Sequence, residues 1–181
     1  MKKDIILAGV GGQGILSIAT IIGYAAVESG LFLKQAEVHG MSQRGGDVQS
    51  HLRISHRQIY SDLIPHGTAD IILSVEPMEA LRYLPYLSSE GWLITNTTPY
   101  QNIPDYPELS ELLAEIRKLP HHITIAADDM ARELGAVRSM NMIMLGTASP
   151  LLEIDYEKLK EGIRFIFSRK GEDIVEMNLK A

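Results

Sequence analysis

Residues 5–14 of the chain, IILAGVGGQG, decide the fold, because a short apolar run leads directly into a group of four glycines. The run Ile5-Ile6-Leu7-Ala8 is typical of a parallel strand that is buried on both faces. After Gly14, apolar residues recur at helical spacing as far as Ala26, and Gly30 follows where a left-handed residue can end a helix. Strand, glycine turn and helix together predict the start of an α/β fold.

The glycine turn fits the pattern GxGxxG between a strand and a helix, which is where this pattern binds phosphate groups. In that setting Gly9 allows a tight turn, Gly11 lets a phosphate approach the backbone, and Gly14 lets the helix pack closely against the strand. Free amides at the helix start attract an anion. The residues leave two interpretations open, a phosphate-containing ligand or a protein neighbour. The predicted binding residues are Gly9, Gly11, Gly12, Gln13 and Gly14.

A second loop, rich in glycine and polar residues, follows the strand predicted over residues 31–38. The guanidinium of Arg44 can grip a carboxylate, a phosphate or a backbone carbonyl. Glu37 lies near the strand end, where a nicotinamide dinucleotide requires an acid for its ribose hydroxyls. We expect both loops to emerge at the carboxyl edge of the sheet. The residues predicted to contact a ligand or partner here are Glu37, His39, Gly40, Met41, Ser42, Gln43, Arg44, Gly45 and Gly46.

Strands and helices alternate along the rest of the chain. Further strands are predicted over residues 70–75, 92–95 and 123–126, and alternating polarity over residues 48–54 and 59–63 predicts a hairpin. Helices are predicted to begin at Glu76-Pro77, to cover residues 108–119, 139–148 and 155–168, and to follow Gly171. The whole pattern predicts a single domain over residues 1–181. We expect a Rossmann-like open, mostly parallel sheet with helices on both faces and a β-hairpin embellishment.

Composition excludes several classes of function. The 181 residues carry a formal net charge of -6, which disfavours nucleic acid as a partner. The chain has no cysteine, so disulfides, thiolate zinc sites and cysteine-ligated iron–sulfur clusters are excluded. The sequence shows neither a signal peptide nor a membrane span, and we expect a cytoplasmic protein.

Potential catalytic and metal-binding side chains do not form a recognisable set. His121 and His122 are adjacent on a predicted strand approach and should point to opposite faces, so no metal site is predicted. The pair Asp128-Asp129 is interpreted as a cap of a short helix that ends at Gly135. No serine has the flanking pattern of a nucleophile elbow. We therefore predict no catalytic residue in this chain.

Three motifs together resemble one protein family. They are residues 9–14 (GVGGQG), residues 36–46 (AEVHGMSQRGG) and residues 76–84 (EPMEALRYL). In combination they resemble the small subunits of indolepyruvate ferredoxin oxidoreductases, in the gamma-type family of pyruvate and 2-oxoacid:ferredoxin oxidoreductases. The middle motif closely resembles the signature that separates the indolepyruvate type from pyruvate-type gamma subunits.

The resemblance implies an accessory, non-catalytic subunit of a heteromeric enzyme. Such an enzyme converts an aryl 2-oxoacid and coenzyme A to acyl-coenzyme A, carbon dioxide and reduced ferredoxin. The large partner subunit carries thiamine diphosphate and the iron–sulfur clusters, and coenzyme A is a candidate ligand at the shared interface. The isolated chain is expected to be inactive and could form a homodimer. The residues alone also leave open an autonomous NAD(P)- or flavin-binding oxidoreductase, or a small-molecule sensor.

Overall fold

A computed structural model describes residues 1–39 and 45–181, with the side chain of His39 excepted. Gly40, Met41, Ser42, Gln43 and Arg44 of the second predicted loop therefore lie outside the described residues. The described chain forms one six-stranded sheet in the order β2-β3-β1-β4-β5-β6. The strands are β1 (Lys2–Val10), β2 (Phe32–His39), β3 (Asp47–Ser55), β4 (Ala69–Ser74), β5 (Leu87–Asn96) and β6 (His122–Ile125).

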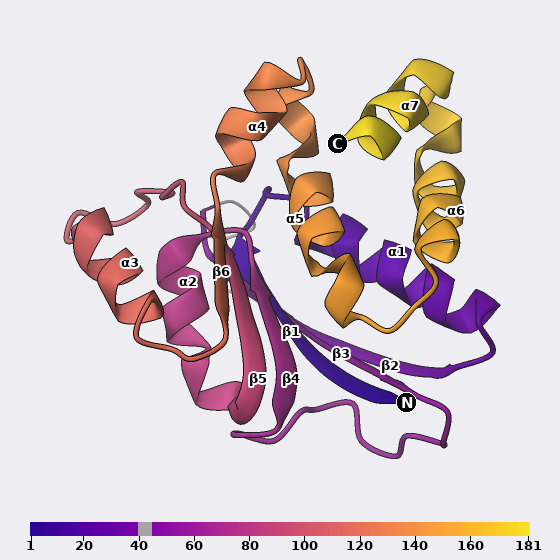
Figure 1. Cartoon of the computed structure of the whole chain (residues 1–181), viewed down its shortest axis with the longest axis horizontal. Helices are drawn as coiled ribbons and strands as arrows, with labels where there is room; N and C mark the ends of the chain where they lie inside the picture. Colours follow the sequence, from indigo (N-terminus) through magenta and orange to yellow (C-terminus); the bar gives the residue numbers. More distant parts are fainter. Residues whose placement is uncertain (40–44) are drawn as a thin grey trace.

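Strands β1, β4, β5 and β6 are parallel, whereas β3 runs antiparallel to both of its neighbours, β1 and β2. Helices cover both faces of this sheet, with α2 and α3 on one face and α1, α5 and α6 on the other (Figure 1). The predicted open, mostly parallel sheet is confirmed. The helices are α1 (Ile15–Glu28), α2 (Pro77–Arg82), α3 (Leu109–Ile116), α4 (Ala127–Glu133), α5 (Met140–Ala148), α6 (Tyr156–Phe167) and α7 (Glu172–Lys180).

Strand β1 is buried on both faces, as its continuous apolar sequence predicts. Ile5 and Leu7 belong to the core beneath α1 and α5, while Ile6 and Ala8 belong to the core beneath α2 and α3, and all four are fully buried. Because side chains alternate along a strand, only an unbroken apolar run can fill two cores at once. The central strand therefore joins the two helical layers.

The hairpin prediction was half wrong. Residues 48–54 do form a strand, but residues 59–63 do not, and the antiparallel partner of β3 is β2. The other side of β3 pairs with β1, so neither of its edges is open to a further strand. The β2–β3 hairpin is thus part of the main sheet, where it extends the parallel strands with an antiparallel pair.

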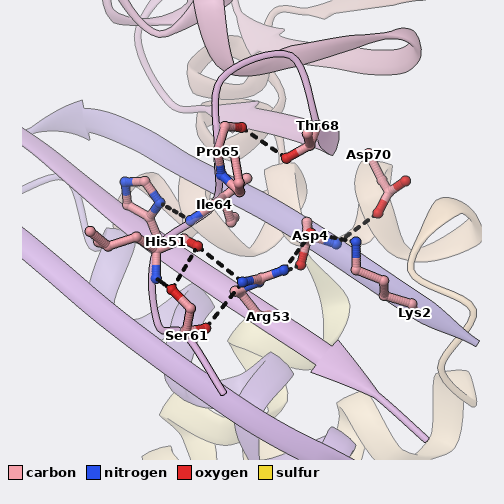
Figure 2. Close-up of polar contacts among 10 residues, drawn as sticks. Lys2, Asp4, His51, Arg53, Ser61, Ile64, Pro65, Thr68 and Asp70 are labelled. Atoms are coloured by element: carbon pink, nitrogen blue, oxygen red, sulfur yellow. Dashed lines mark hydrogen bonds and ion pairs between the residues drawn. The ribbon is translucent and has the colours of Figure 1, made fainter. Parts of the chain in front are cut away.

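The long connection between β3 and β4 is held by polar contacts with the sheet (Figure 2). The Arg53 guanidinium donates to the carbonyls of Ser61 and Leu63 at 3.1 and 3.0 Å. Its other nitrogens form a bidentate pair with the buried carboxylate of Asp4, at 2.8 and 3.1 Å. The carbonyls of residues 61 and 63 thus bind a side chain instead of joining a strand ladder.

His51 makes a second anchor for the same connection. Its Nδ1 accepts a hydrogen bond from the Ile64 amide at 3.0 Å (Figure 2). Its ring also packs edge-on against Tyr86. Burial lowers the pKa of His51 below its ordinary value of 6.5, and the positive charge of Arg53 lowers it further. Protonation of Nδ1 would remove the acceptor that holds Ile64.

We expect the buried, neutral His51 to make stability depend on pH. Its folded pKa lies below its unfolded pKa, so its contribution is fully present above about pH 6.5 and is lost as the pH falls. His51→Gln should reduce the slope of unfolding free energy against pH below about pH 6.5. For one proton this slope cannot exceed about 1.4 kcal/mol per pH unit.

Urea unfolding at several pH values measures this slope. His66→Gln is the matched control, because His66 is exposed and contacts the same Tyr86 ring. Equal slopes in His51→Gln and the unmodified protein would contradict the prediction.

Candidate functional site at the carboxyl edge of the sheet

The glycine loop between β1 and α1 is fixed by its own Gln13. The Gln13 side-chain oxygen accepts from the Val10 amide at 2.8 Å, and the Gln13 amide donates to the Val10 carbonyl at 3.1 Å. Gly12 and Gly14 have positive φ angles of 102° and 81°, which favour glycine. Gly14 is the residue from which α1 begins. The loop is therefore a closed turn with a defined backbone.

Gly9 and Gly14 have no room for a side chain, because other elements pack closely against their Cα atoms. A Cβ atom on Gly9 would lie 2.4 Å from the Val75 side chain and 2.8 Å from that of Ile15. A Cβ atom on Gly14 would lie 2.5 Å from the amide nitrogen of Asn141, which donates to the Gly14 carbonyl at 3.2 Å. Gly9 thus joins β1, β4 and α1, and Gly14 packs against α5. These two glycines serve chain packing, whatever binds the loop.

The two predicted loops meet through their backbones. The Gly11 amide donates to the Gly46 carbonyl at 2.9 Å. One residue earlier, the Gly45 carbonyl accepts from the side-chain amide of Asn102 at 2.6 Å. The structure therefore brings Gly45 and Gly46 to the glycine loop. It also uses the amide of Gly11, which the sequence assigned to a phosphate, for a contact within the chain.

Glu37 lies near the end of β2, as expected, but β2 is not the neighbour of β1. In a dinucleotide-binding sheet the acid follows a strand next to the glycine loop. Here β3 lies between β1 and β2, so Glu37 is two strand spacings from β1, roughly 10 Å in the plane of the sheet. Its carboxylate accepts from Gln35 at 2.5 Å. Glu37 does not occupy the position of a ribose-binding acid beside the glycine loop.

Two cavities flank the start of α1. One, of about 270 Å³, is largely apolar and is lined by Val10, Gly11, Gly12, Gly14, Ile15, Leu16 and Val48. The other, of about 490 Å³, lies on the α5 and α7 side of Gly14 and includes two cationic side chains, Arg138 and Lys170. The larger volume falls in the usual range for small-molecule sites.

A buried acidic cluster lies beside the loops, and sequence reasoning missed it. Glu76 is fully buried after β4, and its carboxylate accepts from the Tyr100 amide at 3.2 Å and from the Tyr106 hydroxyl. Glu79 is also buried and pairs with Arg82 at 2.9 Å. Burial raises the pKa of Glu79, and burial followed by the bond to Glu76 raises the pKa of Tyr106. Tyr106 therefore keeps its proton and remains a donor.

The predicted cap of α4 was also wrong. The helix begins after Ala126 without a side-chain cap, and Asp128 lies in its first turn. Asp128 instead accepts from the side-chain amide of Asn96 at 2.7 Å, while the Asn96 oxygen accepts from the Ala127 amide at 3.1 Å. Asn96 thus caps the helix from the end of β5. An asparagine that directly follows a predicted strand was the available signal.

Large apolar side chains are exposed along this edge of the sheet. They follow the carboxyl ends of β1, β5 and β6 or lie near the end of β2, and each is at least 40% exposed. Several exposed apolar side chains along one edge of a sheet are typical of a surface that binds protein. We call these residues the apolar rim: Leu16, Val38, Tyr100, Ile103, Met130 and Val137.

No metal-binding cluster is found among residues 1–39 and 45–181: no three side chains of His, Asp or Glu are grouped to hold an ion. None of the helices in this part of the chain combines the length and apolar character needed to span a bilayer.

Comparison with known proteins identifies relatives over the whole chain. The family model for pyruvate ferredoxin/flavodoxin oxidoreductase matches residues 4–181. Indolepyruvate oxidoreductase subunit IorB of Archaeoglobus fulgidus is 38% identical over 190 residues, covering 100% of this chain and 92% of the relative. The same subunit of Pyrococcus horikoshii is 38% identical, with 100% and 93% covered. These matches confirm the resemblance carried by the three motifs.

Longer relatives contain a similar domain as one part. Ketoisovalerate oxidoreductase subunit VorA of Methanothermobacter thermautotrophicus is 27% identical over 96% of this chain but only 34% of its own length. The 2-oxoglutarate:ferredoxin oxidoreductase of Magnetococcus marinus, solved with 2-oxoglutarate, coenzyme A and succinyl-CoA bound, shares the fold. Its TM-score is 0.76, its identity 23%, and the match covers 99% of this chain and 29% of that one.

We expect Gly14→Ala to destabilise the chain more than Gly12→Ala. Both residues have positive φ, so each substitution costs about 1–2 kcal/mol of unfolding free energy. Only at Gly14 does the new methyl group meet Asn141, which adds about 1–3 kcal/mol. Urea unfolding measures both. Adding Asn141→Ala to Gly14→Ala should recover much of the excess, and equal losses in the two single variants would contradict the assignment.

Proposed function

Because the chain belongs to the pyruvate ferredoxin/flavodoxin oxidoreductase family, we propose that it is the accessory subunit of an indolepyruvate-type enzyme. That enzyme would convert an aryl 2-oxoacid and coenzyme A to acyl-coenzyme A, carbon dioxide and reduced ferredoxin. The observation that carries the proposal is 38% identity with IorB subunits over the full chain. We place the complex in the cytoplasm, in line with the expectation from the sequence.

The redox cofactors would belong to a large partner subunit. Oxidative decarboxylation needs an electron sink for the carbanion and carriers for two electrons. This chain has no cysteine to hold a cluster, and its described residues offer no group of carboxylates for the metal ion of a thiamine diphosphate. Neither group fits this chain, so we assign thiamine diphosphate and the iron–sulfur clusters to the partner, which would pass electrons to ferredoxin.

The carboxyl edge is the proposed contact with that partner. Support comes from the apolar rim and from the Gly11 amide, which binds the Gly46 carbonyl of its own chain. Of the two interpretations of the glycine loop, these observations favour a protein neighbour over an exposed nucleotide. The described residues of the signature motif, 36–39 and 45–46, border the same edge.

Coenzyme A is the small ligand that we propose for the shared interface. The 490 Å³ cavity beside Gly14 carries Arg138 and Lys170, whose charges suit a diphosphate. With coenzyme A bound in this cavity, this chain would bind its phosphates and the partner would bind the 2-oxoacid. The cavity residues of this chain would bind and orient the thiol carrier and perform no redox step.

The autonomous NAD(P)- or flavin-binding oxidoreductase is the weaker alternative. The glycine pattern does lie between a strand and a helix, but the intervening β3 moves Glu37 away from it. Heat released on titrating the isolated chain with NADH, NADPH or FMN would favour that alternative.

We expect activity only when both subunits are present. Indolepyruvate-driven, coenzyme A-dependent reduction of ferredoxin or a viologen dye should appear in a mixture of this chain with its large partner. Neither subunit alone should reach the rate of the mixture. Full activity of the large subunit alone would refute the accessory role, and activity of this chain alone would refute the division of cofactors.

We expect a charge in the apolar rim to weaken assembly. Leu16→Glu or Met130→Glu should lower the affinity for the large subunit by about tenfold or more, because a buried carboxylate would then lack a partner. The matched control is Leu63→Glu, since Leu63 is a similarly exposed leucine in the connection at the opposite edge. Surface plasmon resonance with immobilised large subunit measures the affinities. Losses of equal size in Leu16→Glu and Leu63→Glu would place the contact elsewhere.

A further inference from the structure

Glu76 is a fully buried carboxylate at the carboxyl edge that the proposed function does not yet use. It directly follows β4 and precedes α2, and one of its oxygens accepts from the Glu79 amide at 2.8 Å. That bond alone makes Glu76 the cap of a short helix. An aspartate would provide this cap equally well, so capping does not account for the longer side chain.

The other oxygen of Glu76 reaches a different segment. It accepts from the Tyr100 amide at 3.2 Å and from the Tyr106 hydroxyl. Both donors lie in residues 97–108, which connect β5 to α3 without a helix or strand of their own. Tyr106 keeps its proton because burial and the adjacent carboxylate raise its pKa. One oxygen of Glu76 therefore binds two points, Tyr100 and Tyr106, of a connection that has no regular structure.

Asn102 lies in the chain between Tyr100 and Tyr106, and it links this connection to the loop that contains Gly45. Its side-chain amide donates to the Gly45 carbonyl at 2.6 Å, and the next carbonyl, that of Gly46, accepts from the Gly11 amide at 2.9 Å. The contacts run in series from the acid after β4, through the connection after β5, to the loop after β1. Segments far apart in the chain are thereby joined by a few hydrogen bonds.

We propose that Glu76 is a positioning residue that fixes the carboxyl edge through Tyr106 and Asn102. By holding residues 97–108, it sets Asn102 against Gly45 and so keeps Gly45-Gly46 on the glycine loop. The inference rests on the proposed function in one respect, because the edge so fixed is the face offered to the large subunit. Loops that are ordered before binding lose less conformational entropy on assembly, which strengthens binding.

Amide hydrogen exchange at Gly11, followed by NMR on the isolated full chain, tests the relay. Tyr106→Phe and Asn102→Ala should each speed exchange about fivefold to tenfold, the usual effect of losing one buried hydrogen bond. The control Tyr100→Phe removes a hydroxyl from the same connection but leaves the backbone bond to Glu76. It should leave Gly11 exchange unchanged.

Two further variants separate the relay from simple structural roles. Glu76→Asp keeps a capping carboxylate for α2 but is too short to reach residues 97–108, so it should speed Gly11 exchange as Tyr106→Phe does. Because the contacts act in series, Tyr106→Phe combined with Asn102→Ala should be no faster than the faster single variant. Unchanged exchange in Glu76→Asp, or effects that multiply in the double variant, would overturn the proposal.

Assembly supplies an independent measurement. Tyr106→Phe should weaken binding to the large subunit severalfold and leave the turnover number of the saturated complex unchanged. The exchange experiment uses this chain alone, so it decides the relay even if no large subunit binds. Failure of the unmodified chain to bind would count against the proposed function and leave the relay standing. Normal exchange in the variants would reject the relay whatever the complex does.

Discussion

The contact on which the carboxyl edge depends is the close approach of β1, β4 and α1 at Gly9. The side chains of Val75 and Ile15 occupy the space that a Cβ on Gly9 would need. This approach sets where the glycine loop leaves the sheet and where α1 starts. Asn141 then reaches the Gly14 carbonyl from α5, so the layer of α1, α5 and α6 is tied to the same turn. The glycine pattern thus specifies packing first, and any binding follows from that packing.

The insertion of β3 changes what this edge can bind. In a simple α/β sheet the strand after the first helix would lie beside β1, and an acid at its end could contact a ligand on the glycine loop. Here β3 takes that place, which moves Glu37 outward and brings Gly46 to the loop. Exposed apolar side chains follow several strands at the same edge. A dinucleotide-like motif is therefore combined with an edge that suits a protein surface.

Local patterns in the sequence predicted most elements but not their pairing. The apolar run at Ile5, the helical spacing after Gly14 and the start of α2 at Pro77 each depend on a few neighbouring residues, and each is confirmed. Residues 59–63 alternate in polarity like a strand, yet both edges of β3 are already taken by β1 and β2, which precede it in the chain. Alternation within a segment carries no information about such partners.

The contacts within the candidate site could not be predicted from local sequence patterns either, because their partners are far apart in the chain. Glu76 was read as part of a helix start, which is correct, but its second oxygen binds residues 24 and 30 positions later in the chain. Asn102 lies in a proline-rich stretch without periodicity, and its partner Gly45 is 57 positions away. The sequence motifs identified the loops that meet at the edge, because glycines mark turns. The side chains that hold those loops together are single polar residues, which only the folded chain brings into contact.

A subunit without cysteine acts on an electron-transfer enzyme in part through the surface that it offers to other subunits. A contact surface binds most effectively when its loops are ordered before binding. Here the ordering does not rely on the partner: Gln13 closes the glycine loop, Gly46 binds Gly11, and Glu76 holds the connection that carries Asn102. Each link is a hydrogen bond to a buried or partly buried group, which water replaces poorly. The free energy that keeps this edge in shape therefore comes from the fold of the small subunit, so the binding energy of the large subunit need not be used to order it.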